Sequence, residues 1–491
     1  MKTFAELQAQ FGPIWALNRP GETQEHAVIA MCSFGLGETT LAHYQSRLSA
    51  LEHRYLLAML MLNRIPTCRF VFLSTEEPGP EVIDYYFSLL PDEKRGLRDR
   101  FTAITLADHS ARSVADKLLD RPDEMARVRA AVGGLPAFIE PWNVTGHEVE
   151  VARHLDAPIN GTAPDLWHLG FKSAGRRIFR EAGVPVPYGH EDVRTVDDVA
   201  AAIDDIRGVR LAAPGVVIKH DNSASGDGNV VIRFANLPDA GAEAVRAHVA
   251  ALPEWYLRDL AEGGIVEELI AGSDFSSPSA QVDITPFGHV HLISTHEQML
   301  GGTDGQVYQG CRFPADPGYA ARLGDYALRI AHAIAPMGVL GRFAVDFACA
   351  RDDSGAWQVY ALEMNLRKGG TTHPFATLRN LVPGHYDPKA GAWLTHEHEP
   401  RFYVSTDNLV DPAWLGLPPR DVIAAVADAG LAFTPERNWG VVLHMLSCLA
   451  VDGRVGLTAI GTSPDHAERL YGAVRPAIER AAASRAQPAS S

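Results

Sequence analysis

Residues 341–365 constrain the fold most strongly, because apolar and polar residues alternate there in two segments joined by a polar turn. Such alternation predicts two strands, each with one buried face. The first strand places Arg342, Ala344 and Asp346 on its polar face; the second places Glu363, Asn365 and Arg367 on its polar face and Leu362, Met364 and Leu366 on its apolar face. With Ser354-Gly355 at the tip, the hairpin pairs Asp346 with Glu363 and Ala344 with Asn365. A slip of one residue would mix the two faces, so the pattern opposes it.

The polar face of this predicted hairpin brings two carboxylates together. Asp346 and Glu363 would repel each other unless a proton or a cation lay between them. With Asn365 they offer only oxygen ligands, which suit Mg²⁺ better than zinc or iron when nucleotide phosphates complete the shell. The alternative is an exposed sheet face with ordinary charges. We favour the metal site because Arg342 and Arg367 share this face and the glycine-rich segment 368–374 follows directly.

A second pattern lies upstream, where the apolar segment 215–219 ends in Lys219 and leads into the Ser/Gly/Asp/Asn loop 221–229. A lysine on a rigid strand can meet phosphate oxygens, and small residues such as Ser225, Gly226 and Gly228 allow backbone N–H groups to close over them. The motif GxxxxGK[ST] does not occur in the sequence, so this is not a P-loop. Taken alone, the loop is also compatible with an ordinary hairpin connection.

Bulk properties narrow the function classes. The 491 residues are 46% hydrophobic and 21% charged, which predicts a globular chain of two or three domains. The net charge of -16 and the scattered Lys and Arg argue against a nucleic-acid partner. The five cysteines lack CxxC spacing and are expected to be small buried residues. No signal peptide or membrane-length apolar run is seen, so we expect a cytoplasmic protein without a membrane partner.

The flanking regions indicate the domain order. Strands at 27–31 and 69–74, with a helical pattern from Leu48 to Leu62 between them, predict an α/β layer. Gly35-Leu36-Gly37 lacks the third glycine of a dinucleotide loop, so a simple turn is preferred. Turn-forming residues mark a boundary near 165, and a helix from Lys172 should end at Gly183. The tail 481–491 is small and polar and is predicted to be disordered.

In this order, Lys172, Lys219 with its loop, the segment 266–274, Asp346 and Glu363-Met364-Asn365 together resemble the ATP-grasp superfamily. Within it, the chain is most similar to the pheganomycin peptide ligase family. That similarity is carried by residues 52–55, 83–86, 169–173 and 363–374, and by 440–446 and 456–461 in the C-terminal region. The resemblance implies an α/β (α+β) chain with a pre-ATP-grasp domain at 1–164, an ATP-grasp domain of two subdomains at 165–380 and a small α+β domain at 381–491.

The resemblance also implies roles for individual residues. Lys172 and Lys219 would hold the ATP phosphates, and Glu267, Glu268 and Leu269 would form the adenine hinge. Asp274 stands where the superfamily usually has a ribose-binding Glu, and its shorter side chain puts that contact in doubt. Asp346, Glu363 and Asn365 would hold Mg²⁺. Arg342 would steady the transferred phosphoryl group and the tetrahedral intermediate, and Lys219 and Arg367 are the other catalytic candidates.

This site predicts a carboxylate–amine ligase that makes an acyl phosphate and ADP and then an amide or peptide bond. Loop 221–229 and segment 301–305 are candidate lids against hydrolysis. The substrates implied by the resemblance are an amino-acid-like carboxylate and an amino acid or peptide amine, in natural-product biosynthesis. His296, Gln298 and His373 are candidate substrate contacts, although each could equally be structural.

Two alternatives to this function remain open. One is an ATP-grasp enzyme with a thiol or hydroxyl acceptor, and the other is a non-catalytic nucleotide-binding regulator. A homodimer is compatible with the sequence.

Overall fold

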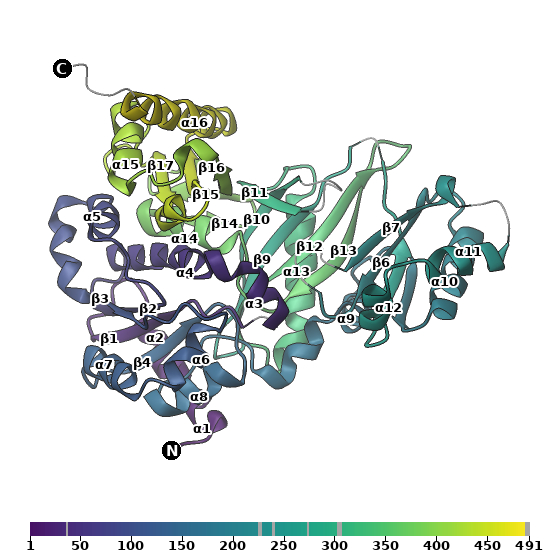
Figure 1. Ribbon diagram of the computed structural model, residues 1–491, viewed down its shortest axis with the longest axis horizontal. Coiled ribbons are helices and arrows are strands. Elements are labelled where there is room, and N and C mark those ends of the chain that lie inside the picture. The colour runs from purple at the N-terminus through teal and green to yellow at the C-terminus, as the bar shows by residue number, and fades with distance from the viewer. Residues whose placement is uncertain (36–37, 224–227, 238–240, 273, 302–306, 487–491) are drawn as a thin grey trace.

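The computed structural model describes residues 1–35, 38–223, 228–237, 241–272, 274–301 and 307–486. Three sheets organise these residues. Figure 1 shows an N-terminal α/β unit, a small lobe around β6 and β7 on the opposite side, and a large central sheet that continues into the C-terminal strands.

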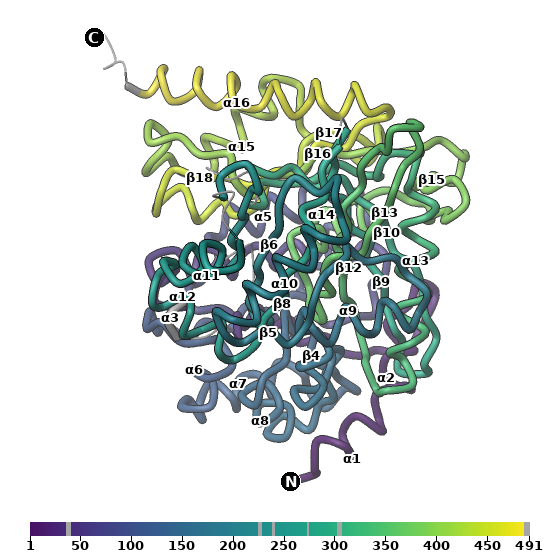
Figure 2. Tube along the Cα trace, turned by 90° about the vertical axis from the view of Figure 1, so that its right-hand side faces the viewer, coloured from purple at the N-terminus to yellow at the C-terminus, as the bar shows by residue number. Residues whose placement is uncertain are grey.

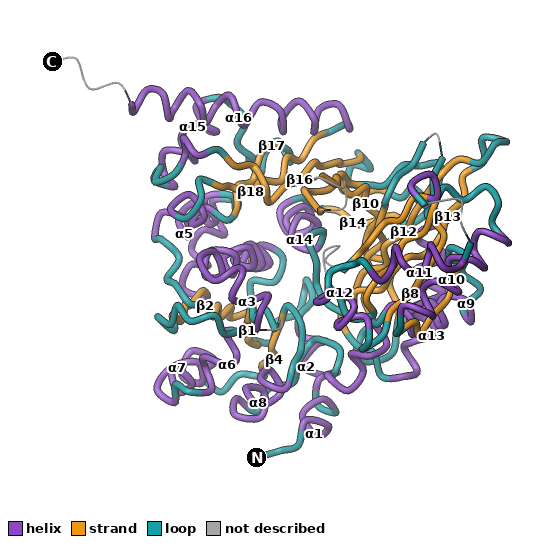
Figure 3. The backbone as a smooth tube through the Cα atoms, turned by 45° about the vertical axis from the view of Figure 1, so that its right-hand side comes forward, coloured by secondary structure: helices purple, strands orange, loops and turns teal. Residues whose placement is uncertain are grey.

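The N-terminal unit is a parallel sheet of order β3-β2-β1-β4. Its strands are β1 (His26–Met31), β2 (Cys68–Ser74), β3 (Phe101–Thr105) and β4 (Ala137–Pro141). Its α-helices are α1 (Phe4–Gln8), α2 (Phe11–Leu17), α3 (Glu38–Tyr44), α4 (Leu48–Glu52), α5 (Pro80–Ser88), α6 (Val114–Leu119), α7 (Pro122–Val132) and α8 (Gly146–Leu155). Every residue of β1 is buried because helices cover both faces of the sheet (Figure 3). The predicted α/β layer is therefore confirmed.

The small lobe has a separate antiparallel sheet of order β5-β8-β6-β7. Its elements are β5 (Gly189–Val193), α10 (Val196–Val209), β6 (Gly215–His220), β7 (Asn229–Arg233), α11 (Ala242–Ala250), α12 (Glu254–Leu260) and β8 (Gly264–Glu268). Helix α9 (Lys172–Glu181) leads into the lobe and ends before Gly183, whose φ of +69° suits glycine. The predicted end of this helix is confirmed.

The central sheet has ten strands, ordered β13-β12-β9-β10-β11-β16-β15-β14, with β18 paired to β16 and β17. Its strands are β9 (Pro278–Ile284), β10 (Val290–Gly301), β11 (Val307–Phe313), β12 (Gly341–Arg351), β13 (Trp357–Asn365), β14 (Gly384–Asp387), β15 (Ala392–Thr395), β16 (Pro400–Val410), β17 (Gly440–His444) and β18 (Arg454–Gly461). Helices α13 (Ala320–Ile334), α14 (Thr372–Leu381), α15 (Pro419–Asp428) and α16 (Pro464–Ala486) accompany it. The sheet thus crosses the boundary expected at 380, and the expected division into three domains stays a prediction.

Helix α13 shows how the sequence attaches a helix to this sheet. Leu323, Ala327, Ile330 and Ile334 recur every three or four residues and are fully buried. They join a core formed by Val282 of β9 and its neighbours. Figure 2 shows the chain ends at opposite extremes of the molecule, with α1 at one and α16 at the other.

Several expectations need correction. The helix predicted from Leu48 to Leu62 is α-helical only to Glu52 and continues as the 3-10 helix η2 (His53–Asn63). Helix α16 reaches Ala486, so the disorder predicted from Ala481 is wrong up to that residue. All five cysteines are buried free thiols, as expected. Within the described ranges, no helix combines the length and the apolar character needed to cross a membrane.

Candidate active site

The predicted hairpin is present, and its polar face has the predicted pairs. Strands β12 and β13 are antiparallel, with Asp346 opposite Glu363 and Ala344 opposite Asn365. In the turn, Asp352 Oδ1 accepts hydrogen bonds from the backbone N–H groups of Ser354 and Ala356, at 2.9 and 3.1 Å. Such a side chain-to-backbone bond is a common turn signal of aspartate. The hairpin therefore gathers two carboxylates and an amide on one side of the sheet.

A β-bulge that the sequence did not reveal makes this pairing possible. Near the turn, Arg351 pairs with Trp357 and Phe347 with Ala361, and this register would place Asp346 opposite Leu362. The register shifts after Phe347, so Leu362 is the additional residue of β13. Leu362 is half-buried while Ala361 and Met364 are in the core, so its predicted place on the apolar face is wrong. The bulge restores the pairing of the two carboxylates.

The electrostatics of this pair favour the binding of a proton or a cation. Burial, followed by the nearby Glu363, raises the pKa of Asp346 to about 8. Burial would also raise the pKa of Glu363, but Lys172, Lys219 and Arg367 outweigh it and lower that pKa. Asp346 also accepts hydrogen bonds from Gln298 Nε2 at 2.7 Å and from Asn365 Nδ2 at 2.9 Å. An all-oxygen set that must take up a proton or a cation fits Mg²⁺.

Two lysines approach these carboxylates from the small lobe and α9. Lys172 Nζ lies 3.4 Å from Glu363 Oε2 and donates to Ser223 Oγ at 2.9 Å. Lys219 Nζ lies 2.6 Å from Glu267 Oε1 and is near enough to Glu363 to lower the pKa of that carboxyl. Both lysine side chains are buried, and the charges of both act on Glu363. An anion such as a polyphosphate would find paired cations there.

The loop after Lys219 is described only in part. Gly228 has a φ of +85°, and a Cβ there would approach His220 Nδ1 to 2.6 Å, so this position requires glycine. Ser225 and Gly226 lie outside the described residues, as do residues 302–306 in the other predicted lid.

The predicted hinge residues hold the lobe together. Glu267 is fully buried and is bonded to Lys219 and, at 2.5 Å, to Arg176. Glu268 accepts a hydrogen bond from the Tyr188 N–H at 2.8 Å and pairs with Arg210 at 2.7 Å. The N–H of Leu269 donates to Gly215 O at 2.9 Å.

Asp274 stands apart from the hinge. It is exposed and pairs with Arg351 near the hairpin turn at 3.1 Å. A contact of Asp274 with ribose stays a prediction.

The three predicted substrate contacts fall in different places. Gln298 donates a hydrogen bond to Asp346, one of the predicted metal ligands. His296 is fully buried, and its Nε2 lies 2.6 Å from the Tyr403 hydroxyl. His373 is also buried and bonds to Asp407 at 2.9 Å. The structure thus gives both histidines contacts within the protein core, whereas Gln298 contacts the carboxylate pair.

His373 belongs to a buried network that sequence reasoning missed. Asp407 Oδ1 accepts from Nε2 of His373 at 2.9 Å and from Nε2 of His444 at 2.7 Å, and Asp407 Oδ2 pairs with Arg54 at 3.0 Å. These atoms come from α14, β16, β17 and η2. Their spacing could also accommodate a metal ion, but both Nδ1 atoms are buried without a partner. Metal-bound imidazoles normally donate from the second nitrogen, so hydrogen bonding explains the group better.

The buried histidines predict an acid-sensitive fold. Burial lowers the pKa of His296 to about 3 and of His373 to about 4 from 6.5. Between pH 6.5 and 4 the unfolded chain therefore binds protons that the folded chain does not. At pH 5 each histidine lowers the free energy of unfolding by about 2 kcal/mol relative to neutral pH. Urea unfolding from pH 7.5 to 5 should show this loss.

A control variant isolates the contribution of one histidine. Burial raises the pKa of Glu52 to about 7, which acts in the opposite direction, so the wild-type slope is a sum. His296→Gln should weaken the loss of stability with falling pH by about 1.4 kcal/mol per pH unit in this range. An unchanged slope would contradict the assignment of His296 as neutral and buried.

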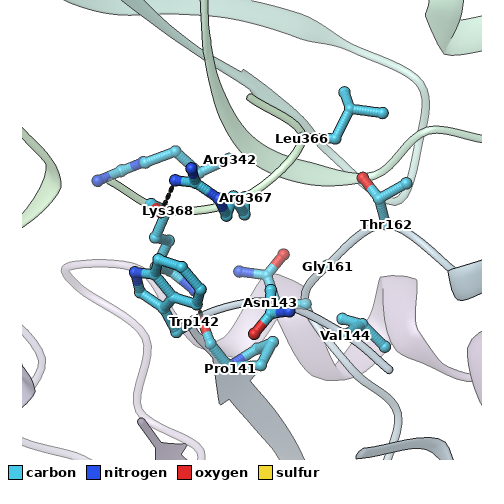
Figure 4. A pocket seen from close by; sticks show the side chains of 11 residues that line it. Pro141, Trp142, Asn143, Val144, Gly161, Thr162, Arg342, Leu366, Arg367 and Lys368 are labelled. Carbon is cyan, nitrogen blue, oxygen red and sulfur yellow. Dashed lines mark hydrogen bonds between the residues drawn. The ribbon is translucent and has the colours of Figure 1, made fainter. Parts of the chain in front are cut away.

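A cavity lies where the N-terminal unit meets the base of the hairpin (Figure 4). Its lining includes Trp142, Asn143, Asn160, Thr162, Arg342 and Arg367. Figure 4 shows the two arginines on one side and Trp142 with Asn143 on the other. The Arg367 guanidinium stacks on Trp142 at 4.8 Å from the ring centroid. Both arginines therefore lie in the cavity wall, beyond the Ala344–Asn365 pair.

Trp142 and Asn143 are further residues that sequence reasoning missed. Asn143 exchanges two 2.9 Å hydrogen bonds with the backbone of Gly35. A Cβ on Gly35 would come within 2.4 Å of Thr145, so only glycine fits there. These residues follow β4 and β1, next to each other at the carboxyl ends of the sheet. The strand order that brings these residues together cannot be read from sequence.

Known proteins share this architecture. Residues 236–387 match the family described as IQCH-like, ATP-grasp, and residues 421–474 match the PGM1 C-terminal domain. Among solved structures, the ADP complex of N5-carboxyaminoimidazole ribonucleotide synthetase has a TM-score of 0.52 at 13% identity, covering 93% of this chain and 97% of that one. Rhizobium etli pyruvate carboxylase has a TM-score of 0.52 at 17% identity, covering 91% and 36%. At these identities the structures establish the fold alone.

Two relatives extend over much of the sequence. IQ motif-containing protein H of Danio rerio is 23% identical over 354 residues, which are 60% of this chain and 33% of that protein. The L-propargylglycine–L-glutamate ligase of Streptantibioticus cattleyicolor is 32% identical over 416 residues, which are 82% of this chain and 84% of that protein. The chain therefore belongs to the pheganomycin-type peptide ligases of the ATP-grasp superfamily, ATP-dependent enzymes that form carbon–nitrogen bonds.

Proposed function

We propose that the enzyme uses ATP and Mg²⁺ to phosphorylate the carboxyl group of an amino-acid-like acid and then joins the acyl group to an amino acid or peptide amine. The observation that carries this proposal is the meeting of the Asp346–Glu363 pair with Lys172 and Lys219, two carboxylates with two buried ammonium groups. Such a site can hold a metal–nucleotide complex.

Each side chain of the site has its own role in this proposal. Asp346, Glu363 and Asn365 would hold Mg²⁺, which supplies charge neutralisation at the transferred phosphoryl group. Lys172 and Lys219 bind phosphate oxygens, and doing so would replace the bonds that they now make to Glu363, Ser223 and Glu267. Gln298 orients Asp346 by its hydrogen bond.

The two arginines of the cavity face the acid substrate in this proposal. Arg367 lies near Glu363 and Asp346, since both carboxylates act on its pKa, which burial lowers. It therefore steadies negative charge while a carboxylate oxygen attacks the γ-phosphorus and ADP leaves. Arg342 is four residues from Asp346 along β12, about 13 Å of strand, so it suits the substrate better than the phosphoryl group. The amine then attacks the acyl carbon, phosphate leaves and the amine loses a proton.

The relative's name supports amino acids as both substrates, because it pairs L-propargylglycine with L-glutamate. We therefore propose an amino-acid donor and an amino-acid or peptide acceptor, in peptide natural-product biosynthesis. The thiol or hydroxyl acceptor has no specific observation in its favour. A non-catalytic role is opposed by the presence of every expected metal-ligand and lysine side chain.

Acyl phosphate formation can be tested without knowing the amine. The enzyme with Mg²⁺ and ATP is incubated with a library of amino acids and dipeptides, and hydroxylamine serves as the acceptor. We expect ADP release together with the hydroxamate of the activated acid. The product with an added amino acid should have the mass of the two minus water. ADP release without hydroxamate from any acid would contradict the acyl phosphate route.

A further inference from the structure

Three arginines lie near enough to one another for the charges of two of them to act on the third. Arg342 is on β12, Arg379 is in α14 and Arg64 follows η2. Asn63 Nδ2 donates to Asn380 O at 2.7 Å, which fixes the end of η2 beside α14 and brings Arg64 and Arg379 together. The Nε of Arg379 is buried without a hydrogen-bond partner. Among the described residues, no carboxylate oxygen lies within 4.0 Å of any of these three guanidinium groups.

The lowered pKa of Arg379 shows that this arrangement disfavours its positive charge. The pKa of this guanidinium is lowered from 12.5 to about 9, first by burial and then by the charges of Arg342 and Arg64. Asp283 and Glu140 offset only part of this effect. Glu140 is itself paired with Lys368, at 2.5 Å. Like charges close together inside a protein destabilise its fold, and a bound anion would relieve the repulsion that Asp283 and Glu140 do not offset.

One member of this group, Arg342, lies where ligands of such folds bind. Arg342 lines the cavity together with Trp142 and Asn143, which follow β4. In the sheet order β3-β2-β1-β4, the chain progresses away from β1 in both directions, so β1 and β4 flank the switch point. Ligands of open α/β sheets bind at this point, outside the carboxyl ends of the strands. Charge and topology therefore both indicate the surroundings of Arg342.

We infer that the acid substrate carries a second carboxylate, beyond the one that is phosphorylated, and that Arg342, Arg379 and Arg64 bind it. The inference rests on the proposed function, because it assigns the far end of the acid that the site activates. Arg367 lies nearer the metal ligands and serves the reacting carboxylate, whereas the three arginines select a dicarboxylic amino acid over its amide. Arg379 and Arg64 are thus specificity-determining residues.

Kinetics with matched acids test this selection. Hydroxamate formation is measured with Mg²⁺ and ATP for L-aspartate, L-glutamate and L-2-aminoadipate, and for L-asparagine and L-glutamine. We expect at least one diacid to have a KM at least 10-fold below that of its amide. Arg379→Met should raise the KM for that diacid at least 10-fold and leave the KM values for ATP and the amide within 2-fold. Arg379→Lys, which keeps the charge, should be intermediate.

Stability provides a readout that a merely structural arginine would not give. Arg379→Met should raise the Tm of the free enzyme, because it removes an unpaired buried cation, whereas loss of a structural arginine would lower it. The preferred diacid should raise the Tm of the wild type but not of Arg379→Met. Arg127→Met is the matched control, since Arg127 is an exposed arginine of α7 paired with Glu124, and it should change neither Tm nor KM.

The outcomes separate this inference from the proposed function. Equal KM values for diacids and amides, unaffected by Arg379→Met, would overturn the second carboxylate and leave the ligase intact. A diacid that stabilises the wild type but not Arg379→Met, with no hydroxamate formed, would support the anion site and overturn the acyl phosphate proposal. If no diacid either stabilises or reacts, the anion site is wrong.

Discussion

Asp346→Asn and Glu363→Gln should each lower ADP-forming turnover by about 1,000-fold or more, because each removes a charged ligand from the proposed metal pair. Both substitutions keep the side-chain volume and replace one of two mutually repelling carboxylates. Folding should therefore be preserved, because Asp346→Asn removes both the buried charge and its repulsion with Glu363. Coupled measurement of ADP release, with Mg²⁺ varied from micromolar to millimolar, tests this directly.

The matched control is Asp325→Asn, an exposed carboxylate of α13 paired with Arg329, which should keep full turnover. Removing Mg²⁺ with EDTA should stop the wild-type reaction, and adding Mg²⁺ back should restore it. Turnover within 10-fold of wild type in both hairpin variants would exclude this pair as the metal site.

Asp407→Ala should have the largest effect on stability, about 3–5 kcal/mol, because it leaves a buried cation without its partner. Burial alone would raise the pKa of Asp407, but Arg54 and His373 lower it well below its usual range, so the carboxylate is charged in the fold. Without this carboxylate, Arg54 has lost its charged partner, and the imidazole N–H groups of His373 and His444 have lost their acceptor. Urea unfolding followed by tryptophan fluorescence gives the change.

The control for this variant is Asp428→Ala at the exposed end of α15, which should cost less than about 0.5 kcal/mol. Replacing both charged partners, in Arg54→Met with Asp407→Leu, should cost less than the sum of the single changes, because no unpaired charge remains. Strict additivity would show that the ion pair does not couple the two positions.

The parts of this fold that follow from local pattern could be predicted. Alternation in β12 and β13 placed Asp346 beside Glu363, and the glycine at 183 marked the end of α9. The bulge at Leu362 could not be predicted, because the alternation of apolar and polar residues does not show that the register near the turn, where Asp352 accepts backbone hydrogen bonds, differs by one residue from that at Asp346. The pairing of the carboxylates was thus right, whereas the assumed tip was not.

The long-range contacts could not be predicted from the sequence for a different reason. Arg54, His373, Asp407 and His444 come from four elements, and neither their spacing nor their neighbours in sequence indicate that they meet. The same holds for Arg64 and Arg379, and for Trp142, whose position in the cavity depends on strand order. His296 and His373 were polar residues near site motifs, but burial decided their contacts.

The pairing of β11 with β16 limits which parts of the enzyme can move and where the chain can be truncated. It unites the β12–β13 hairpin and the C-terminal strands in one sheet, where a hinge would break backbone hydrogen bonds. The lobe of β5–β8 has its own sheet. A rotation of this lobe would therefore change the backbone only where the chain enters it after α9 and leaves it after β8. A truncated chain that ends before β16 would expose the unpaired edge of β11 and tend to aggregate.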